Sequence, residues 1–166
     1  MKVKQLSLTA LIAALYAALV VVLAPISFGP IQLRIADSLI PTSAILGWPA
    51  IFGVALGAII GNTYFFISPI DIIFGALANF LAGYILFRYR VHFYLAAIAA
   101  SIILGFIVGG YLWLFFPPPD IFGLSAPVAM IISITFSSLI AVSIIGVTLV
   151  EVLRRSGFIK QIESLG

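Results

Sequence analysis

The residues Leu6–Leu23 read LSLTALIAALYAALVVVL, a stretch without a charged side chain. A helix needs about 20 predominantly apolar residues to cross the roughly 30 Å of hydrocarbon in a bilayer. The stretch therefore predicts a transmembrane helix, which Ala24-Pro25 is expected to end. Lys2 and Lys4 precede it as in a signal peptide, but no A-x-A-like cleavage site follows, so we expect a retained first helix.

Outside this stretch the charges are just as sparse. The 166-residue chain is 64% hydrophobic and 8% charged, with a mean hydropathy of +1.33, whereas about a quarter of the residues in a soluble domain are charged. Further charge-free intervals are Asp37–Asp71, Asp71–Arg88, His92–Asp120 and Asp120–Glu151. This pattern predicts a single integral membrane domain over residues 1–166 and excludes a separate soluble domain.

Proline and glycine divide the apolar sequence into six helices, so the expected fold is an all-α membrane protein with six transmembrane helices. The breaks are expected at Ser27-Phe28-Gly29-Pro30, Gly47-Trp48-Pro49, Ser68-Pro69 and Pro117-Pro118-Pro119-Asp120. The expected helices are about Leu6–Leu23, a short one from an N-cap at Asp37 or Ser38 to Gly47, Ala50–Phe66, Pro69–Phe87, Phe93–Phe116 and Ala126–Val152.

The basic residues give the orientation, because cytoplasmic loops carry an excess of Lys and Arg. Basic clusters precede the first helix and follow the fourth and the sixth: Lys2 and Lys4; Arg88 and Arg90; Arg154, Arg155 and Lys160. Six spans place all three clusters on one side, so both termini are expected to be cytoplasmic. These residues can contact anionic lipid headgroups, and without a basic patch that carries interleaved aromatics no nucleic-acid role is expected.

The sequence offers little for catalysis. Cysteine is absent, and His92 is the single histidine. There is no Ser-His-Asp set, no metal-ligand pair and no glycine-rich phosphate loop after a strand. We therefore expect no enzyme, no metal site and no cofactor, and a location in the cell membrane as a multi-pass protein.

Ionisable residues in or near spans are functional candidates because they are costly in hydrocarbon. Arg34 and Asp37 lie three residues apart at the outer end of the second helix. They form either a local ion pair or helix cap, or a substrate site at the outer mouth. Asp71, at the start of the fourth helix on the same side, is either a helix cap or part of that site.

Amides and aromatics near these acids are the next candidates. Asn62 and Asn79 must be hydrogen-bonded within the bundle, and we interpret Asn79 as a contact between helices, whereas Asn62 is equally a ligand-binding candidate. Gln32 and Phe74 could frame a flat ligand, although aromatics at a membrane interface usually form a belt. Tyr111, Trp113 and Asp120 are expected in such a belt and its loop.

Two stripes of small residues predict close helix packing. The third helix contains Gly53-x-x-x-Gly57-x-x-x-Gly61, which we interpret as packing within the molecule. The first helix repeats alanine at the same spacing, and this stripe could dock another protein. Its members are Ala10, Ala14 and Ala18, together with Ala13 and Ala17.

Two segments carry a family resemblance. Residues 28–39, FGPIQLRIADSL, resemble the G-x-[IV]-Q-x-R-x-[SA]-E-A-L segment of the QueT family, and residues 71–78, DIIFGALA, are similar to its D-[IV]-[VI]-F-G-[ST]-L-A segment. The spacing of the segments and the glycine-rich third helix also fit. Asp37 stands where the family usually has Glu, and Ser38 where it has Ala, so the acid is retained with a shorter reach.

The resemblance implies a substrate-binding S component of an energy-coupling factor (ECF) transporter, a six-helix protein with both termini inside. Such a subunit captures a vitamin or similar micronutrient, here a queuosine precursor with a 7-deazaguanine base. It then joins a transmembrane coupling subunit and two cytoplasmic ATPases. Ala10, Ala14 and Ala18 match the docking surface of S components.

The ligand chemistry fits these residues. A carboxylate accepts two adjacent N–H donors of a guanine-like edge, so Asp37 or Asp71 could bind that edge, and Gln32, Arg34 or Asn62 could serve the carbonyl. Two other function classes remain open at this stage, a stand-alone channel or secondary carrier and a purely structural membrane subunit. A proton-coupled carrier needs an acid deep in the bundle, whereas both acids are expected at the ends of spans.

Overall fold

The structure is a computed structural model that describes residues 3–28, 32–121 and 123–156. Within these residues the regular secondary structure is helical, and none of it is β-strand. Four segments are long and apolar enough to cross a membrane. They are α1 (Val3–Val22), α5 (Pro69–Arg88), the segment Arg90–Leu112 with η2 (Arg90–His92) and α6 (Phe93–Leu112), and the segment Ala126–Arg155 with α7 (Ala126–Ser138), η3 (Leu139–Gly146) and α8 (Val147–Arg155).

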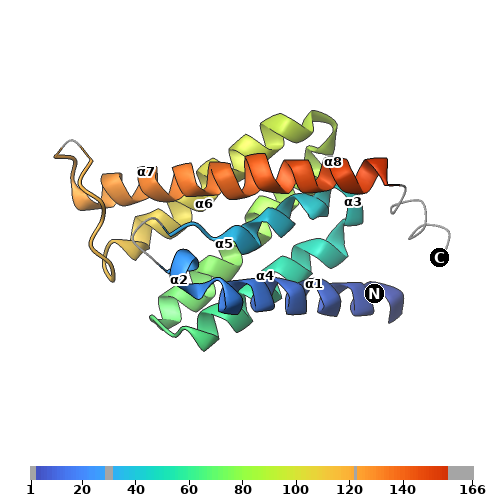
Figure 1. The fold of residues 1–166 in the computed structure, drawn as a ribbon, viewed down its shortest axis with the longest axis horizontal. Coiled ribbons are helices and arrows are strands. Elements are labelled where there is room, and N and C mark those ends of the chain that lie inside the picture. The colour runs from blue at the N-terminus through green and yellow to red at the C-terminus, as the bar shows by residue number, and fades with distance from the viewer. Residues whose placement is uncertain (1–2, 29–31, 122, 157–166) are drawn as a thin grey trace.

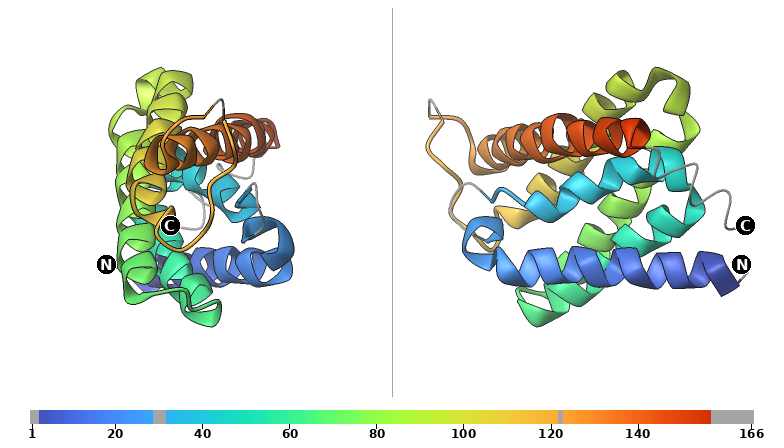
Figure 2. Two further views of the ribbon diagram at one scale, coloured as in Figure 1. Left: turned by 90° about the vertical axis from the view of Figure 1, so that its left-hand side faces the viewer. Right: turned by 45° about the vertical axis from the view of Figure 1, so that its right-hand side comes forward.

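Two shorter apolar segments complete the bundle. One combines η1 (Ile35–Thr42) with α3 (Ser43–Leu46), and the other is α4 (Trp48–Tyr64). A single turn, α2 (Ala24–Ser27), follows α1. The beginning of α1 and the end of α8 lie at the same end of the bundle (Figures 1 and 2).

Helices α1 and α4 pack closely because glycines line their contact. An added Cβ at Gly53 would lie 2.7 Å from Ile12 Cβ, and one at Gly57 would lie 2.6 Å from Tyr16 Cβ. At Gly61 the nearest atom would be Val20 Cγ1, at 2.9 Å. Distances this short leave no room for a side chain, so the glycine stripe packs within the molecule, as the sequence predicts.

The second segment differs from the expected helix. η1 is a 3-10 helix that begins at Ile35, before the predicted N-cap, and Pro41 lies inside it. Neither Asp37 nor Ser38 is therefore an N-cap, and the side chain of Asp37 bonds to another helix instead. Residues 36–44 are all buried, so this segment lies in the core of the bundle.

The last long segment contains an unexpected stretch of π-helix, η3. A Cβ at Gly146 would lie 2.7 Å from the carbonyl oxygen of Ser38, so the glycine lets η1 approach η3 closely. The Ser101 hydroxyl on α6 donates to the Ser138 carbonyl at 3.1 Å and lies 3.0 Å from the Ser143 hydroxyl. The segments α6, α7 and η1 thus all pack against the π-helix η3.

The end of α8 lies beside the beginning of α6. The Arg154 guanidinium on α8 lies 4.8 Å from the centre of the Phe93 ring, where α6 begins. The Tyr94 hydroxyl donates to Glu151 at 3.2 Å. The turn that carries Arg90 therefore lies beside α8, whereas Lys2, Lys160 and the predicted loop residues Gly29 and Pro30 lie outside the described residues.

Some helix boundaries differ from the predictions. α4 begins at Trp48, two residues earlier than expected, because Gly47 turns the chain with a φ of 67° and Pro49 fits the first turn. α6 ends at Leu112 rather than at Phe116. The last segment continues to Arg155.

Candidate functional site

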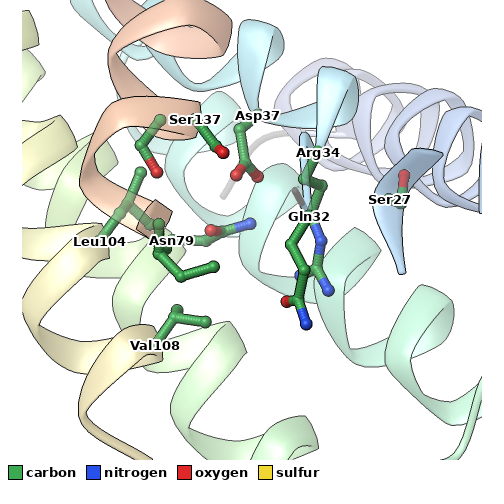
Figure 3. Close-up of a pocket in the computed structure, with 10 residues that line it drawn as sticks. Ser27, Gln32, Arg34, Asp37, Asn79, Leu104, Val108 and Ser137 are labelled. Carbon is green, nitrogen blue, oxygen red and sulfur yellow. The ribbon is translucent and has the colours of Figure 1, made fainter. Parts of the chain in front are cut away.

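A small cavity lies between α2, the loop before η1, α5, α6 and the end of α7 (Figure 3). Its volume is about 30 Å³. One side is polar and the other is apolar, and the apolar side includes Leu104 and Val108. The lining residues are Ser27, Gln32, Arg34, Asp37, Asn79, Leu104, Val108, Ile134, Ser137 and Ser138.

Asp37 provides the acid of this cavity. Its side chain is almost fully buried, with 7% of the residue exposed. Carboxylate Oδ1 accepts a hydrogen bond of 2.5 Å from the hydroxyl of Tyr16, which is completely buried in α1. A buried carboxylate is stable only with hydrogen bonds or a nearby positive charge, so the Tyr16 bond is part of what holds Asp37 at the cavity.

Asn79 connects this pair to the neighbouring helices. Its Nδ2 donates to Tyr16 Oη at 2.8 Å and to the Val54 carbonyl at 3.4 Å. The predicted role of Asn79 as a contact between helices is therefore confirmed. Because Asn79 also lines the cavity, it joins the ligand-binding candidates.

Arg34 lies across the cavity from Asn79, with Gln32 beside it (Figure 3). The Arg34 guanidinium lies 5.4 Å from the centre of the Phe28 ring. An ion pair joins Arg154 and Glu151 on α8, whereas the side chains of Arg34 and Asp37 do not come within ion-pair distance of each other. The local Arg34–Asp37 ion pair, one alternative left open by the sequence, is thus not formed.

The positive charge of Arg34 is nevertheless favoured. Desolvation by burial disfavours the charge, but the nearby carboxylates of Asp37 and Asp71 favour it, and the net effect raises the pKa of Arg34 above its ordinary value. Gln32 holds a φ of 50°, a conformation that few residues other than glycine adopt. The polar residues that line the cavity thus include a cation, an acid and two amides.

Asp71 and Asn62 form a second buried cluster, outside the lining of this cavity. Asp71 Oδ1 accepts from the Tyr111 hydroxyl at 2.8 Å, and Asn62 Nδ2 donates to the Asp71 carbonyl at 3.0 Å. Ser68 is the N-cap of α5, because its hydroxyl accepts from the Asp71 N–H at 3.2 Å. Asp71 itself lies in the first turn, as predicted, but Tyr111 is 8% exposed and is not a belt residue.

Phe74 lies away from the cavity. It is 45% exposed, and its ring centre is 6.0 Å from that of Tyr111. It borders an apolar groove with Ile70, Leu77 and Ile107. The structure therefore brings Gln32, Arg34 and Asp37 together, and leaves Asn62, Asp71 and Phe74 at a second place.

The family model of the QueT transporter matches residues 6–155. The chain belongs to the QueT transporter family. No curated protein and no solved structure gives a significant match. As a member of the QueT family with four long apolar helices, the chain is a multi-pass membrane protein with a transport role.

The two motifs of the QueT resemblance occupy the two polar clusters. The segment with Gln32, Arg34 and Asp37 lines the cavity. The segment that begins at Asp71 lies on α5, and its Gly75 is next to Asn62, because a Cβ there would lie 2.6 Å from Asn62 Nδ2. The described part of the chain contains no group of three or more His, Cys, Asp or Glu that could hold a metal ion.

Sequence reasoning missed Tyr16, which hydrogen-bonds to Asp37, and Ser137 and Ser138, which line this cavity. Tyr16 is a single hydroxyl in an apolar span, and a polar group in hydrocarbon needs a hydrogen-bond partner. That signal could have identified it. Ser137 and Ser138 gave no such signal, because serine in a helix often bonds to its own backbone.

The alanine stripe of α1 has two faces. Ala13 and Ala17 are buried. Ala10, Ala14 and Ala18 are exposed, as are Leu11 and Leu15 beside them. The stripe thus exposes three small residues on the outside of the bundle, next to two leucines.

Proposed function

We propose that this QueT-family protein is the S component of an ECF-type importer and captures a queuosine precursor, a 7-deazaguanine base, on the outer side of the membrane. The observation that supports this most is the cavity between Asp37 and Arg34, two groups of opposite charge that do not pair. An acid and a cation held apart at one cavity can each bind a different part of one ligand.

The chemistry of the base fits the two sides of the cavity. A deazaguanine edge presents adjacent N–H donors next to a carbonyl. Asp37 accepts from this donor edge, and Arg34 or Gln32 donates to the carbonyl. The apolar side, with Leu104 and Val108, packs against the flat ring.

Binding also requires the cavity to open. A volume of about 30 Å³ holds roughly two water molecules, and a bicyclic base is larger. Gln32 and Arg34 precede η1 in a loop, where side chains move at lower cost than in the core. We therefore expect these two side chains to shift when the base enters.

The topology of the proposal has six spans, the four long segments plus the two shorter ones, with both termini in the cytoplasm. The common end of α1 and α8 supports an even number of spans. The basic residues Arg88, Arg90 and Arg154 are expected to face the cytoplasm by the positive-inside rule. The cavity then lies toward the outer side.

Energy must come from partners in this proposal. The exposed residues Ala10, Ala14 and Ala18 dock the transmembrane coupling subunit, because small side chains let two helices approach closely. Two cytoplasmic ATPases complete the importer.

Calorimetry on the purified protein tests capture directly. We expect saturable binding of a 7-deazaguanine base in mild detergent, and uptake into cells only when the coupling subunit and the ATPases are co-expressed. Uptake without them would favour the stand-alone channel or carrier. Wild-type protein that binds no deazapurine would remove this substrate class.

A further inference from the structure

The hydrogen bonds between Asp37, Tyr16 and Asn79 run in one direction. A tyrosine hydroxyl has a single hydrogen, and that of Tyr16 is donated to Asp37 Oδ1 at 2.5 Å. Toward Asn79 the Tyr16 oxygen can therefore only accept. Asn79 must present its NH₂ group to it, as the distance of 2.8 Å from Nδ2 to Tyr16 Oη reflects.

The same bonds fix the orientation of the Asn79 amide. Its Nδ2 also donates to the Val54 carbonyl at 3.4 Å. Turning the amide over would set Asn79 Oδ1 against two oxygens that have no hydrogen to give, so the hydrogen-bond network allows one assignment. Asn79 Oδ1 then remains an acceptor in a residue that lines the cavity, and neither Tyr16 nor the Val54 carbonyl can donate to it.

Asp37 and Asn79 both line the cavity, from η1 and α5, and Figure 3 shows the carboxylate and the amide close together there. Each side chain carries an acceptor oxygen. Arg34 and Gln32 offer donors across the cavity. A ring N–H next to an exocyclic amine matches two neighbouring acceptors. A base without the exocyclic amine would leave one acceptor unsatisfied, which costs affinity.

We propose that Asn79 is a specificity-determining residue that accepts a hydrogen bond from the exocyclic 2-amino group of the ligand, while Asp37 accepts from the adjacent ring N–H. Tyr16 is the positioning residue that keeps the Asn79 acceptor turned toward the ligand. This inference rests on the proposed function, because it assigns the recognition of one functional group of the proposed substrate class.

Two bases that differ by one group provide the test. Calorimetry with 7-deazaguanine and 7-deazahypoxanthine, which lacks the 2-amino group, gives a ratio of affinities for each variant. We expect the wild type to prefer 7-deazaguanine by about tenfold. We expect Asn79→Ala and Tyr16→Phe to reduce this ratio to less than about threefold.

Tyr111→Phe is the matched control. It removes the same hydroxyl from a buried tyrosine bonded to a carboxylate, at a place that does not line the cavity. We expect its ratio of affinities to equal that of the wild type. A lower ratio in Tyr16→Phe alone then cannot come from the general loss of a buried hydroxyl. If Tyr16→Phe does not fold, the ratio of affinities measured on Asn79→Ala alone tests the role of Asn79.

The outcomes separate the two proposals. Wild-type protein that binds neither base contradicts the proposed function and the inference with it. Wild-type protein that binds both bases equally, or an Asn79→Ala variant that keeps the full preference, overturns the role of Asn79 and leaves the substrate class standing. A Tyr16→Phe variant that folds and keeps the full preference overturns the positioning role.

Discussion

Replacing Asp37 with asparagine tests the acid of the cavity with almost no change in shape. The carbonyl of the new side-chain amide can still accept the Tyr16 hydroxyl bond, which is 2.5 Å long in the wild type. The second carboxylate oxygen becomes an NH₂ group, however, so an acceptor is replaced by a donor that faces the N–H groups of the ligand. The substitution is therefore expected to weaken binding while the fold is retained.

The magnitude follows from the burial of the carboxylate. Asp37 is 7% exposed, so water competes little for its oxygens. A hydrogen bond to a charged group contributes about 1.5–3 kcal/mol, and this corresponds to a loss of affinity of about tenfold to a hundredfold. Calorimetry with a 7-deazaguanine base measures the loss, and thermal unfolding in the same detergent shows whether the variant is folded.

Asp71→Asn is the comparison variant. Asp71 is also buried, at 1% exposure, and also accepts from a tyrosine hydroxyl, but it does not line the cavity. We expect its affinity to change by less than about threefold. Unchanged affinity in Asp37→Asn would refute the role of Asp37, and an equal loss in both variants would show that the ligand reaches the second cluster.

Three further predictions concern packing, docking and topology. Gly57→Ala should destabilise the protein by about 1–3 kcal/mol, because the new Cβ would lie 2.6 Å from Tyr16 Cβ; thermal unfolding measures this, with Gly110→Ala as the control, since a Cβ there has no atom within 4 Å. Ala14→Leu should leave ligand binding intact and block uptake, because the bulky side chain holds a partner helix away; normal uptake would contradict the docking assignment. Labels at both termini should react only from the cytoplasm, and a signal from the outside would contradict six spans.

The sequence predicted the membrane character and the long helices well, because charge-free stretches and proline breaks are local signals. It also predicted that the glycine stripe of α4 packs within the molecule. The nature of η1 could not be predicted in this way. Its 3-10 geometry follows from tertiary packing, in which Gly146 of the π-helix makes room for the backbone of Ser38.

Part of the candidate site could also be predicted, because part of it is a local motif. Gln32, Arg34 and Asp37 are close in sequence, so one short motif brings them to one cavity. Asp71 was grouped with them because both acids were expected on the same side of the membrane. Whether two acids share a cavity depends on the rotation of each helix about its axis, and α5 turns Asp71 toward Tyr111 and Asn79 toward Tyr16.

Helix α1 contributes to both parts of the proposed transport cycle. The Tyr16 hydroxyl donates to Asp37, the proposed ligand-binding acid, and the Tyr16 ring packs against Gly57, so Tyr16 cannot move independently of α4. Ala14, in the same helical turn, is exposed on the proposed docking face. Two residues of a helix at this spacing are about 3 Å apart along its axis, so a partner that shifts α1 by even a fraction of a turn also moves the hydroxyl that positions Asp37. Docking and release of the ligand can therefore be coupled through one rigid helix, with no separate moving element between the two sites.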